Sequence, residues 1–299
     1  MFTIAALYHF APVADPVQMQ SSVKMRCEEL EIKGTLLIAN EGINGTISGA
    51  AANIDSILGF LSSIPEFADL VWKLSTSPEQ PFARLKVRLK REIVTMGQPD
   101  VDPRGAVGQY IEPEDWNDFI SAEDVVVIDT RNDYEVSIGT FDGAIDPKTK
   151  SFREFPSWWE DNKQRFANQK VAMFCTGGIR CEKSTSYLRS QGIEEVFHLK
   201  GGILKYLEEV PEEKSVWNGE CFVFDGRVSV GHGLEIGPHQ LCYGCRRPIM
   251  PEDVKRENFE LGVSCHQCFS ETSEQDKDRF RERQKQIDLE KRRKLRIED

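Results

Sequence analysis

Apolar strands that alternate with helical segments constrain the fold of this chain more than any other feature. Three segments are apolar across their length: VVVIDTR (125–131), KVAMFCTG (170–177) and EVFHLKGG (195–202). Helical patterns separate these segments and follow the last of them, at 152–166, 183–191 and 203–210. Strands that are apolar throughout and are joined by helices are typical of a parallel sheet covered on both faces. The sequence therefore predicts an α/β domain over residues 113–216.

The segment before this domain has a different order of elements. Strand patterns at 2–10, 34–40 and 46–49 alternate with helical patterns at 15–32 and 51–64, and a last strand is expected at 84–90 rather than 69–74. This order favours a ferredoxin-like α+β sandwich over residues 1–92, with two helices covering one face of a sheet. Residues 93–112 are rich in Pro, Gly and Asp, so we predict a linker there.

Composition narrows the class of protein and its partners. The 299 residues suit two or three domains, and 39% hydrophobic with 29% charged residues is typical of a globular chain rather than a disordered or fibrous one. The net charge of −11 argues against a general binder of polyanions and leaves only local basic patches for nucleic acid. The N-terminal apolar run is too short for a membrane span, and eight cysteines are too few for a disulfide-rich chain. We expect a cytoplasmic protein.

Cys175 ends the second apolar strand and begins a loop whose composition suits an anion. The loop continues through Thr176, Gly177, Gly178, Ile179 and Arg180 directly into a helix. Two glycines allow the backbone to curl so that N–H groups point at the sulfur, and the helix N-terminus and the arginine add positive charge. These features are expected to lower the pKa of the thiol. They favour a nucleophilic thiolate or a persulfide over a buried structural cysteine.

Residues close to this loop have less certain roles. Cys181 either resolves a persulfide or sulfenate on Cys175 as a disulfide, or packs as a small residue in the first helical turn. Asp129 and Arg131, at the end of the neighbouring strand, are expected to brace the domain rather than to contact substrate. For Lys183 we expect a role at the helix start or the surface in preference to contact with a substrate phosphate.

Four cysteines near the C-terminus have the spacing of a metal site. Cys242 and Cys245 form one C-x-x-C pair, and Cys265 and Cys268 form a second pair 19 residues later. This spacing predicts a closed, structural four-cysteine zinc site in a zinc-ribbon-like region over residues 217–273. Free thiols or redox-active pairs are the alternative. Residues 274–299 are rich in both charges and predict a charged helical tail.

A basic run near residue 90 is the candidate RNA surface. Its cations are Arg84, Lys86, Arg88, Lys90 and Arg91. In a strand, basic residues at period two would occupy one face while Leu85, Val87 and Leu89 pack on the other. The basic face would follow RNA phosphates, with Tyr8, His9 and Phe10 from the first strand contacting bases. A plain solvated strand face is the alternative.

Several motifs together resemble a known family. The loop from Cys175 to Arg180, IDTR (128–131), EVSIGTFDGAID (135–146) and KGGI (200–203) resemble a rhodanese domain, in which Cys175 would carry sulfur. With EGING (41–45), FCTGGIRCEKS (174–184) and FVFD (222–225), nearly the whole chain resembles the rhodanese-related tRNA uridine hydroxylases.

That resemblance implies a function and its requirements. It implies oxygen-dependent formation of 5-hydroxyuridine at the wobble uridine of tRNA, with Cys175 as an essential residue of persulfide type. It implies oxygen as co-substrate and leaves the electron donor open. A sulfurtransferase that passes sulfur from Cys175 to an acceptor and a non-catalytic RNA-binding protein are the alternatives. We expect tRNA as partner and neither membrane nor DNA, and the sequence leaves the oligomeric state open.

Overall fold

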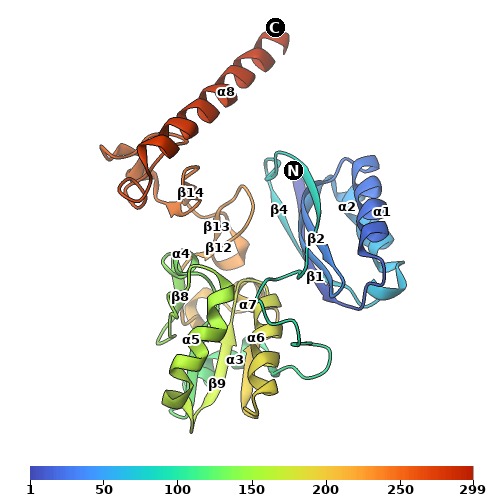
Figure 1. Ribbon diagram of the computed structural model, residues 1–299, viewed down its shortest axis with the longest axis vertical. Helices are drawn as coiled ribbons and strands as arrows, with labels where there is room; N and C mark the ends of the chain where they lie inside the picture. The colour runs from blue at the N-terminus through green and yellow to red at the C-terminus, as the bar shows by residue number, and fades with distance from the viewer. Residues whose placement is uncertain (299) are drawn as a thin grey trace. The chain divides into compact units, whose positions relative to one another are not determined.

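The computed structural model describes residues 1–298, and the chain divides into two compact units, Met1–Glu235 and Ile236–Asp299. The elements are labelled along the chain in Figure 1. Among the described residues, no helix combines the length and the apolar character that a membrane span requires.

The first unit begins with a five-stranded sheet in the order β4-β1-β3-β2-β5. Its elements are β1 (Phe2–Phe10), α1 (Pro16–Glu29), β2 (Lys33–Ala39), β3 (Gly42–Gly49), α2 (Ala51–Ser62), β4 (Val71–Ser77) and β5 (Leu85–Leu89). Neighbouring strands are antiparallel except for β2 and β5, which are parallel. The order confirms the ferredoxin-like arrangement. Both segments weighed as the last strand form strands, and 46–49 is the end of the longer β3.

One face of this sheet is covered and the other is open. Ala5 and Leu7 of β1 pack in a core with Val23 of α1 and Ile54 of α2, and both helices lie on the same side of the sheet (Figure 1). Because successive side chains of a strand point to opposite faces, Tyr8 and its even-numbered neighbours in β1 point away from the helices. We call this second surface the open face.

A parallel sheet in the order β6-β10-β9-β7 forms the next domain. Its strands are β6 (Gln109–Ile111), β7 (Val125–Asp129), β9 (Lys170–Phe174) and β10 (Val196–Leu199). Its helices are α3 (Pro113–Ile120), α4 (Asp133–Val136), α5 (Phe155–Asn162), α6 (Ile179–Ser190) and α7 (Gly202–Glu209). One core joins the sheet to Trp159 of α5 and Leu188 of α6, and a second joins it to Trp116 of α3 and Tyr206 of α7. Helices therefore cover both faces, as predicted.

Several boundaries differ from the expected ones. Residues 109–111 of the expected linker form β6, because they pair with β10 in the parallel sheet. The helix expected at 183–191 begins at Ile179, directly on the Cys175 loop. The helix expected at 152–166 is the shorter α5, flanked by two 3₁₀ turns (Phe152–Glu154 and Lys163–Phe166).

The segment after α7 stays with the first unit, although the cysteine-rich region was expected from residue 217. Here β11 (Trp217–Gly219) pairs with β8 (Gly139–Phe141), and β12 (Cys221–Phe222) pairs with β13 (Ser229–Val230). The second unit contains a small hairpin of β14 (Gln240–Leu241) and β15 (Pro248–Ile249). It ends in α8 (Glu274–Glu298), which spans the expected helical tail.

Candidate functional site

The Cys175 loop connects β9 to α6 and has the predicted inward-facing amide. The backbone N–H of Gly178 donates a hydrogen bond to the Cys175 sulfur at 3.1 Å. Gly178 has a backbone φ of +107°, a conformation that residues other than glycine rarely adopt. Ile179 follows as the first residue of α6, so the sulfur lies at a helix N-terminus. This geometry suits a sulfur-borne negative charge.

The two neighbouring thiols have opposite acidities. Burial raises the pKa of Cys175, but the hydrogen bond with Cys181, the Arg180 charge and backbone amides outweigh burial and leave it below its usual value. Burial and the interaction with Cys175 raise the pKa of Cys181 well above its usual value. The Cys181 sulfur also lies 3.7 Å from the hydroxyl of Thr130. Cys175 is therefore the more acidic thiol of the pair, and Cys181 is the more basic one.

Arg180 does not stand free above the sulfur. Its guanidinium forms two hydrogen bonds of 2.7 and 2.8 Å with the carboxylate of Glu135, which is fully buried. Thr176 joins the same group, because its hydroxyl accepts from Arg180 at 3.3 Å. The ion pair fixes the arginine and partly neutralises it. Glu135 lies in the EVSIG stretch that resembles a rhodanese domain, yet no spacing in the sequence indicated this contact.

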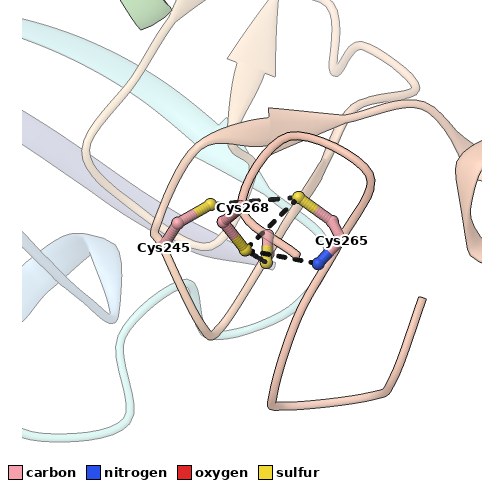
Figure 2. Close-up of side chains that lie close together, drawn as sticks. Cys245, Cys265 and Cys268 are labelled. Carbon is pink, nitrogen blue, oxygen red and sulfur yellow. Dashed lines mark hydrogen bonds between the residues drawn. The ribbon is translucent and has the colours of Figure 1, made fainter. Parts of the chain in front are cut away.

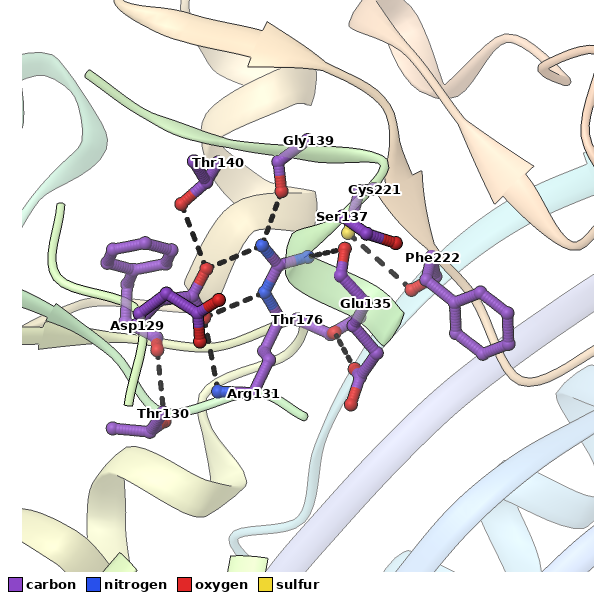
Figure 3. Close-up of polar contacts among 12 residues, drawn as sticks. Asp129, Thr130, Arg131, Glu135, Ser137, Gly139, Thr140, Thr176, Cys221 and Phe222 are labelled. Carbon is purple, nitrogen blue, oxygen red and sulfur yellow. Dashed lines mark hydrogen bonds and ion pairs between the residues drawn. The ribbon is translucent and has the colours of Figure 1, made fainter. Parts of the chain in front are cut away.

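Asp129 and Arg131 form a separate buried pair (Figure 3). The Arg131 guanidinium donates to both carboxylate oxygens of Asp129, at 2.9 and 2.6 Å, and to the carbonyl of Glu135 at 3.2 Å. The hydroxyl of Thr140 completes the group with a 3.0 Å hydrogen bond to Asp129. Both charged side chains are 0% exposed, so the geometry matches a bracing role for the pair.

A cleft of about 1180 Å³ lies between the open face of the N-terminal sheet and the Cys175 loop. Aromatic rings line it: Tyr8, Phe10, Phe82, Trp72, Tyr110, Phe152 and Phe224. Cations line it as well: Lys73, Lys90, Arg104, Arg180, Lys200, Lys205 and Arg227. Cys175, Gly177 and Ile179 form part of its wall. Carboxylates line it too: Glu92, Glu182, Glu208, Glu209 and Asp225. Cys175, which is 0% exposed, thus borders a space that combines aromatic rings with groups of both charges.

Glu182 lies at the edge of this cleft and was not anticipated from the sequence. It accepts hydrogen bonds from the hydroxyl of Tyr8 at 3.0 Å and from that of Tyr110 at 2.9 Å. Burial raises the pKa of the Glu182 carboxyl. Tyr8 was expected to contact bases, and its hydroxyl is instead held next to the loop. The His9 ring lies 6.3 Å from Phe67, a core residue under the helices.

Lys183 is buried, which corrects the expectation of a surface or helix-start role. Only 1% of its side chain is exposed, and its ammonium lies 2.8 Å from Glu41 and 2.7 Å from Glu92. Glu41 also accepts from the N–H of Ile93, and Asn44 donates to the carbonyl of Ile93. Two residues of the EGING motif therefore attach the chain after β5 to the sheet. One of them, Glu41, reaches the helix that follows Cys175.

The basic run forms a strand only in part. Lys86 and Arg88 lie in β5 and alternate with the buried Val87, in register with open-face residues of β2. Arg84, Lys90 and Arg91 lie outside the strand. The expectation that Leu89 packs beside Val87 is wrong, because 43% of its surface is exposed at the strand end. The open face therefore carries two cations in β5, and Lys90 lines the cleft.

The second unit brings the two cysteine pairs together (Figure 2). Their sulfur atoms all lie within 4.8 Å of one another, with 4.0 Å between Cys242 and Cys268 and 3.9 Å between Cys245 and Cys265. A tetrahedral metal with bonds of about 2.3 Å to sulfur has edges of about 3.8 Å. The backbone N–H of Cys265 donates to the Cys268 sulfur at 3.3 Å. The four thiols fit one metal ion.

Comparison with known proteins covers the whole architecture. Residues 2–93 match the UPF0176 acylphosphatase like domain, and residues 112–209 match the rhodanese-like domain. The tRNA uridine(34) hydroxylase of Ruegeria pomeroyi is 67% identical over 97% of this chain and 96% of that protein. The protein of the same name from Roseobacter denitrificans is 61% identical over 98% of this chain and 99% of that protein. The one from Agrobacterium fabrum is 57% identical over 97% of this chain and 92% of that protein. A rhodanese-like domain with this cysteine loop, preceded by an acylphosphatase-like sheet, places the chain in the tRNA uridine(34) hydroxylase family.

Proposed function

We propose that this protein hydroxylates carbon 5 of the wobble uridine, position 34, of tRNA in an oxygen-dependent reaction with Cys175 as the essential residue. The observation that carries the proposal is the Cys175 sulfur, which accepts the Gly178 N–H and lies in the wall of a cleft lined by aromatic rings and charged groups. The family relatives are named for this substrate. A cytoplasmic location follows from a tRNA substrate.

The cleft suits a nucleotide of a single-stranded loop. Unpaired bases are recognised by stacking on aromatic side chains, and Trp72, Tyr110 and Phe224 are exposed rings of this cleft. Phosphates require cations, which Lys90 supplies at the cleft and Lys86 and Arg88 supply on the open face. The other members of the basic run, Arg84 and Arg91, extend this phosphate surface.

The loop determines what happens at sulfur. The Gly178 amide and the Arg180 charge stabilise an anion on Cys175, whether it is a thiolate or the outer sulfur of a persulfide. Thr176 and Gly177 shape the same loop. Molecular oxygen supplies the inserted atom, and an external two-electron donor reduces the second oxygen atom to water. Cys181 holds a proton beside Cys175, and because only a thiolate attacks sulfur, its raised pKa favours a packing and hydrogen-bonding role over that of a resolving thiol.

Nucleoside mass spectrometry of tRNA tests this function. A strain that lacks the gene should contain no 5-hydroxyuridine, and the wild-type protein should restore it. Cys175→Ala should fail to restore it, whereas Cys27→Ala, which removes a thiol from the N-terminal core, should succeed. Full restoration by Cys175→Ala would contradict the proposed role of this residue.

A rhodanese-type sulfurtransferase is the second candidate. The rhodanese-like match over residues 112–209 and the amide that faces the Cys175 sulfur favour it. Incubation with thiosulfate and cyanide separates the two functions. Brisk release of thiocyanate, abolished by Cys175→Ala, would support sulfur transfer, and no release would count against it.

The four-cysteine site of the second unit is proposed to hold structural zinc. Four thiolates in tetrahedral arrangement are the ligands zinc prefers, and no position is left for a substrate. Zinc there would hold the two knuckles together. Metal analysis of the purified protein should find about one zinc per chain. A protein purified without metal under reducing conditions would contradict the assignment.

A further inference from the structure

Three successive carbonyl groups of the Cys175 loop each accept a hydrogen bond from a residue outside the loop. The carbonyl of Cys175 accepts from the N–H of Ile203, and that of Thr176 accepts from the N–H of Leu204, both at 3.0 Å. These two donors belong to the first turn of α7, within the same domain. The third carbonyl, that of Gly177, has its donor in the N-terminal domain.

That donor is Lys73 of β4. Its ammonium donates to the carbonyl of Gly177 at 3.1 Å and also to the carbonyl of Gly201, just before α7. Lys73 is the partner of Ala6 in the β1–β4 ladder, so the sheet determines where its side chain starts. The lysine therefore joins the two turns that surround the sulfur, although 104 residues separate it from Gly177.

The contact acts on the sulfur through a single peptide group. In a trans peptide, the C=O of one residue and the N–H of the next point in opposite directions. Holding the Gly177 carbonyl toward Lys73 therefore turns the Gly178 N–H toward Cys175, where it makes the 3.1 Å hydrogen bond. Hydrogen bonds at both ends of one peptide polarise it and strengthen each other. At φ of +107°, Gly178 itself offers little resistance to other orientations.

The positive charge of Lys73 also favours a negative charge on the Cys175 sulfur. Burial lowers the pKa of Lys73 to about 8, and the negative charge of Cys175 opposes that shift. Lys205, Glu208 and Cys221 are the other titratable groups that act on it. The thiolate is thus one of the groups that keep this buried ammonium charged.

We propose that Lys73 is a positioning residue that orients the Gly177–Gly178 peptide and thereby completes the anion-binding form of the Cys175 loop. The N-terminal domain then has a role in the chemistry at sulfur besides holding RNA. The consequence for hydroxylation rests on the proposed function. The effect on the thiol does not, because it can be measured without tRNA.

The decisive measurement is the apparent pKa of Cys175, from the ultraviolet absorbance of its thiolate across a pH series with the matching Cys175→Ser protein subtracted. Lys73→Met should raise this pKa by about one unit, the effect of losing one hydrogen bond to a charged group. Lys73→Arg, which keeps a cation and donors, should recover at least half of the shift. Lys24→Met removes an exposed cation from α1 and should cause no shift.

Two further readouts separate the possible outcomes. Thermal unfolding of each variant shows whether the first unit remains folded, and an unchanged Cys175 pKa in a folded Lys73→Met protein would overturn the inference. In assays of purified enzyme, Lys73→Met should move the acid limb of the pH–activity profile up by about one pH unit and leave the rate near neutral pH almost unchanged, because a Cys175 pKa of about 5 keeps the thiol ionised there. If the pKa shifts while wild-type protein fails to form 5-hydroxyuridine, the proposed function fails and the role of Lys73 in the loop stands.

Discussion

The ion pair between Arg180 and Glu135 allows a quantitative test of how the cysteine loop is supported. Glu135→Gln keeps the size of the side chain and removes its charge. The carboxylate accepts two hydrogen bonds from Arg180 and one of 3.1 Å from the backbone N–H of Asn132. The NH₂ group of glutamine would face at least one of these N–H groups, so two hydrogen-bond donors would point at each other. Arg180 would then be a buried cation without its counter-charge.

The expected cost follows from burial. The side chain of Arg180 is 9% exposed and that of Glu135 is 0% exposed, so water does not replace the lost partner. Breaking a buried ion pair by removing one charge costs about 3 to 5 kcal/mol of unfolding free energy. Because the remaining oxygen of glutamine can still accept one hydrogen bond, we expect a cost of about 3 kcal/mol. With a denaturant slope of about 1 to 3 kcal/mol per M for a domain, the urea midpoint should fall by about 1 to 3 M.

Tryptophan fluorescence during urea unfolding measures this cost. Four of the five tryptophans, Trp116, Trp158, Trp159 and Trp217, lie between residues 113 and 219, so the signal reports mainly on this domain. Asp124→Asn, which breaks an exposed ion pair with Lys170, is the matched control and should leave the midpoint unchanged. A midpoint for Glu135→Gln equal to that of the control would refute the reasoning.

The pH dependence of the stability of Glu135→Gln tests whether the Arg180–Glu135 pair stabilises the fold through its charges. Burial raises the pKa of Glu135, but the charge and hydrogen bonds of Arg180 outweigh it and hold the pKa below its usual value. The pair therefore stabilises the fold above the unfolded pKa of about 4.3, and this contribution is lost as the pH falls through the folded pKa. The difference between wild type and Glu135→Gln should narrow as the pH falls through this range.

Three more outcomes are expected elsewhere in the chain. Lys183→Met should destabilise the first unit by about 3 kcal/mol, because it leaves the carboxylates of Glu41 and Glu92 without the ammonium between them. Thermal unfolding measures this loss, and an unchanged unfolding midpoint would show that the Lys183 ion pairs do not stabilise the unit. Cys265→Ser should lower bound zinc at least tenfold by metal analysis, and full occupancy would exclude a four-cysteine site. Arg88→Ala should weaken tRNA binding and reduce the salt slope of log K by about 1, and an unchanged slope would remove this residue from the RNA surface.

Local features of the site could be predicted because they depend on neighbouring residues. The sequence from Cys175 to Arg180 contains its own strand end, glycines and helix start, so the inward-facing amide followed from it directly. The same holds for the two C-x-x-C pairs, because the spacing within each pair is local in the chain and the fold had only to bring the two pairs together. The chain order of strands and helices determined the parallel sheet in the same way, since apolar strands need cover on both faces.

Contacts between distant segments could not be predicted in this way. The sequence predicted a positive charge at Arg180 but not its partner, and the structure pairs it with Glu135, 45 residues earlier. The same holds for Lys183, which appeared to be a surface residue and is buried between two carboxylates. Nothing in the periodicity of β4 distinguishes a lysine that reaches the cysteine loop from one that faces water.

By itself, the sequence predicted the domain types, the Cys175 loop and the four-thiol cluster, because each depends on residues close together in the chain. Only the tertiary structure decided which charges support the thiol and which side chains form the cleft around it. The physical reason is that a hydrogen bond or ion pair depends on distance in space. Lys73 and Gly177 come within 3.1 Å only after the open face of one sheet packs against the loop of another domain.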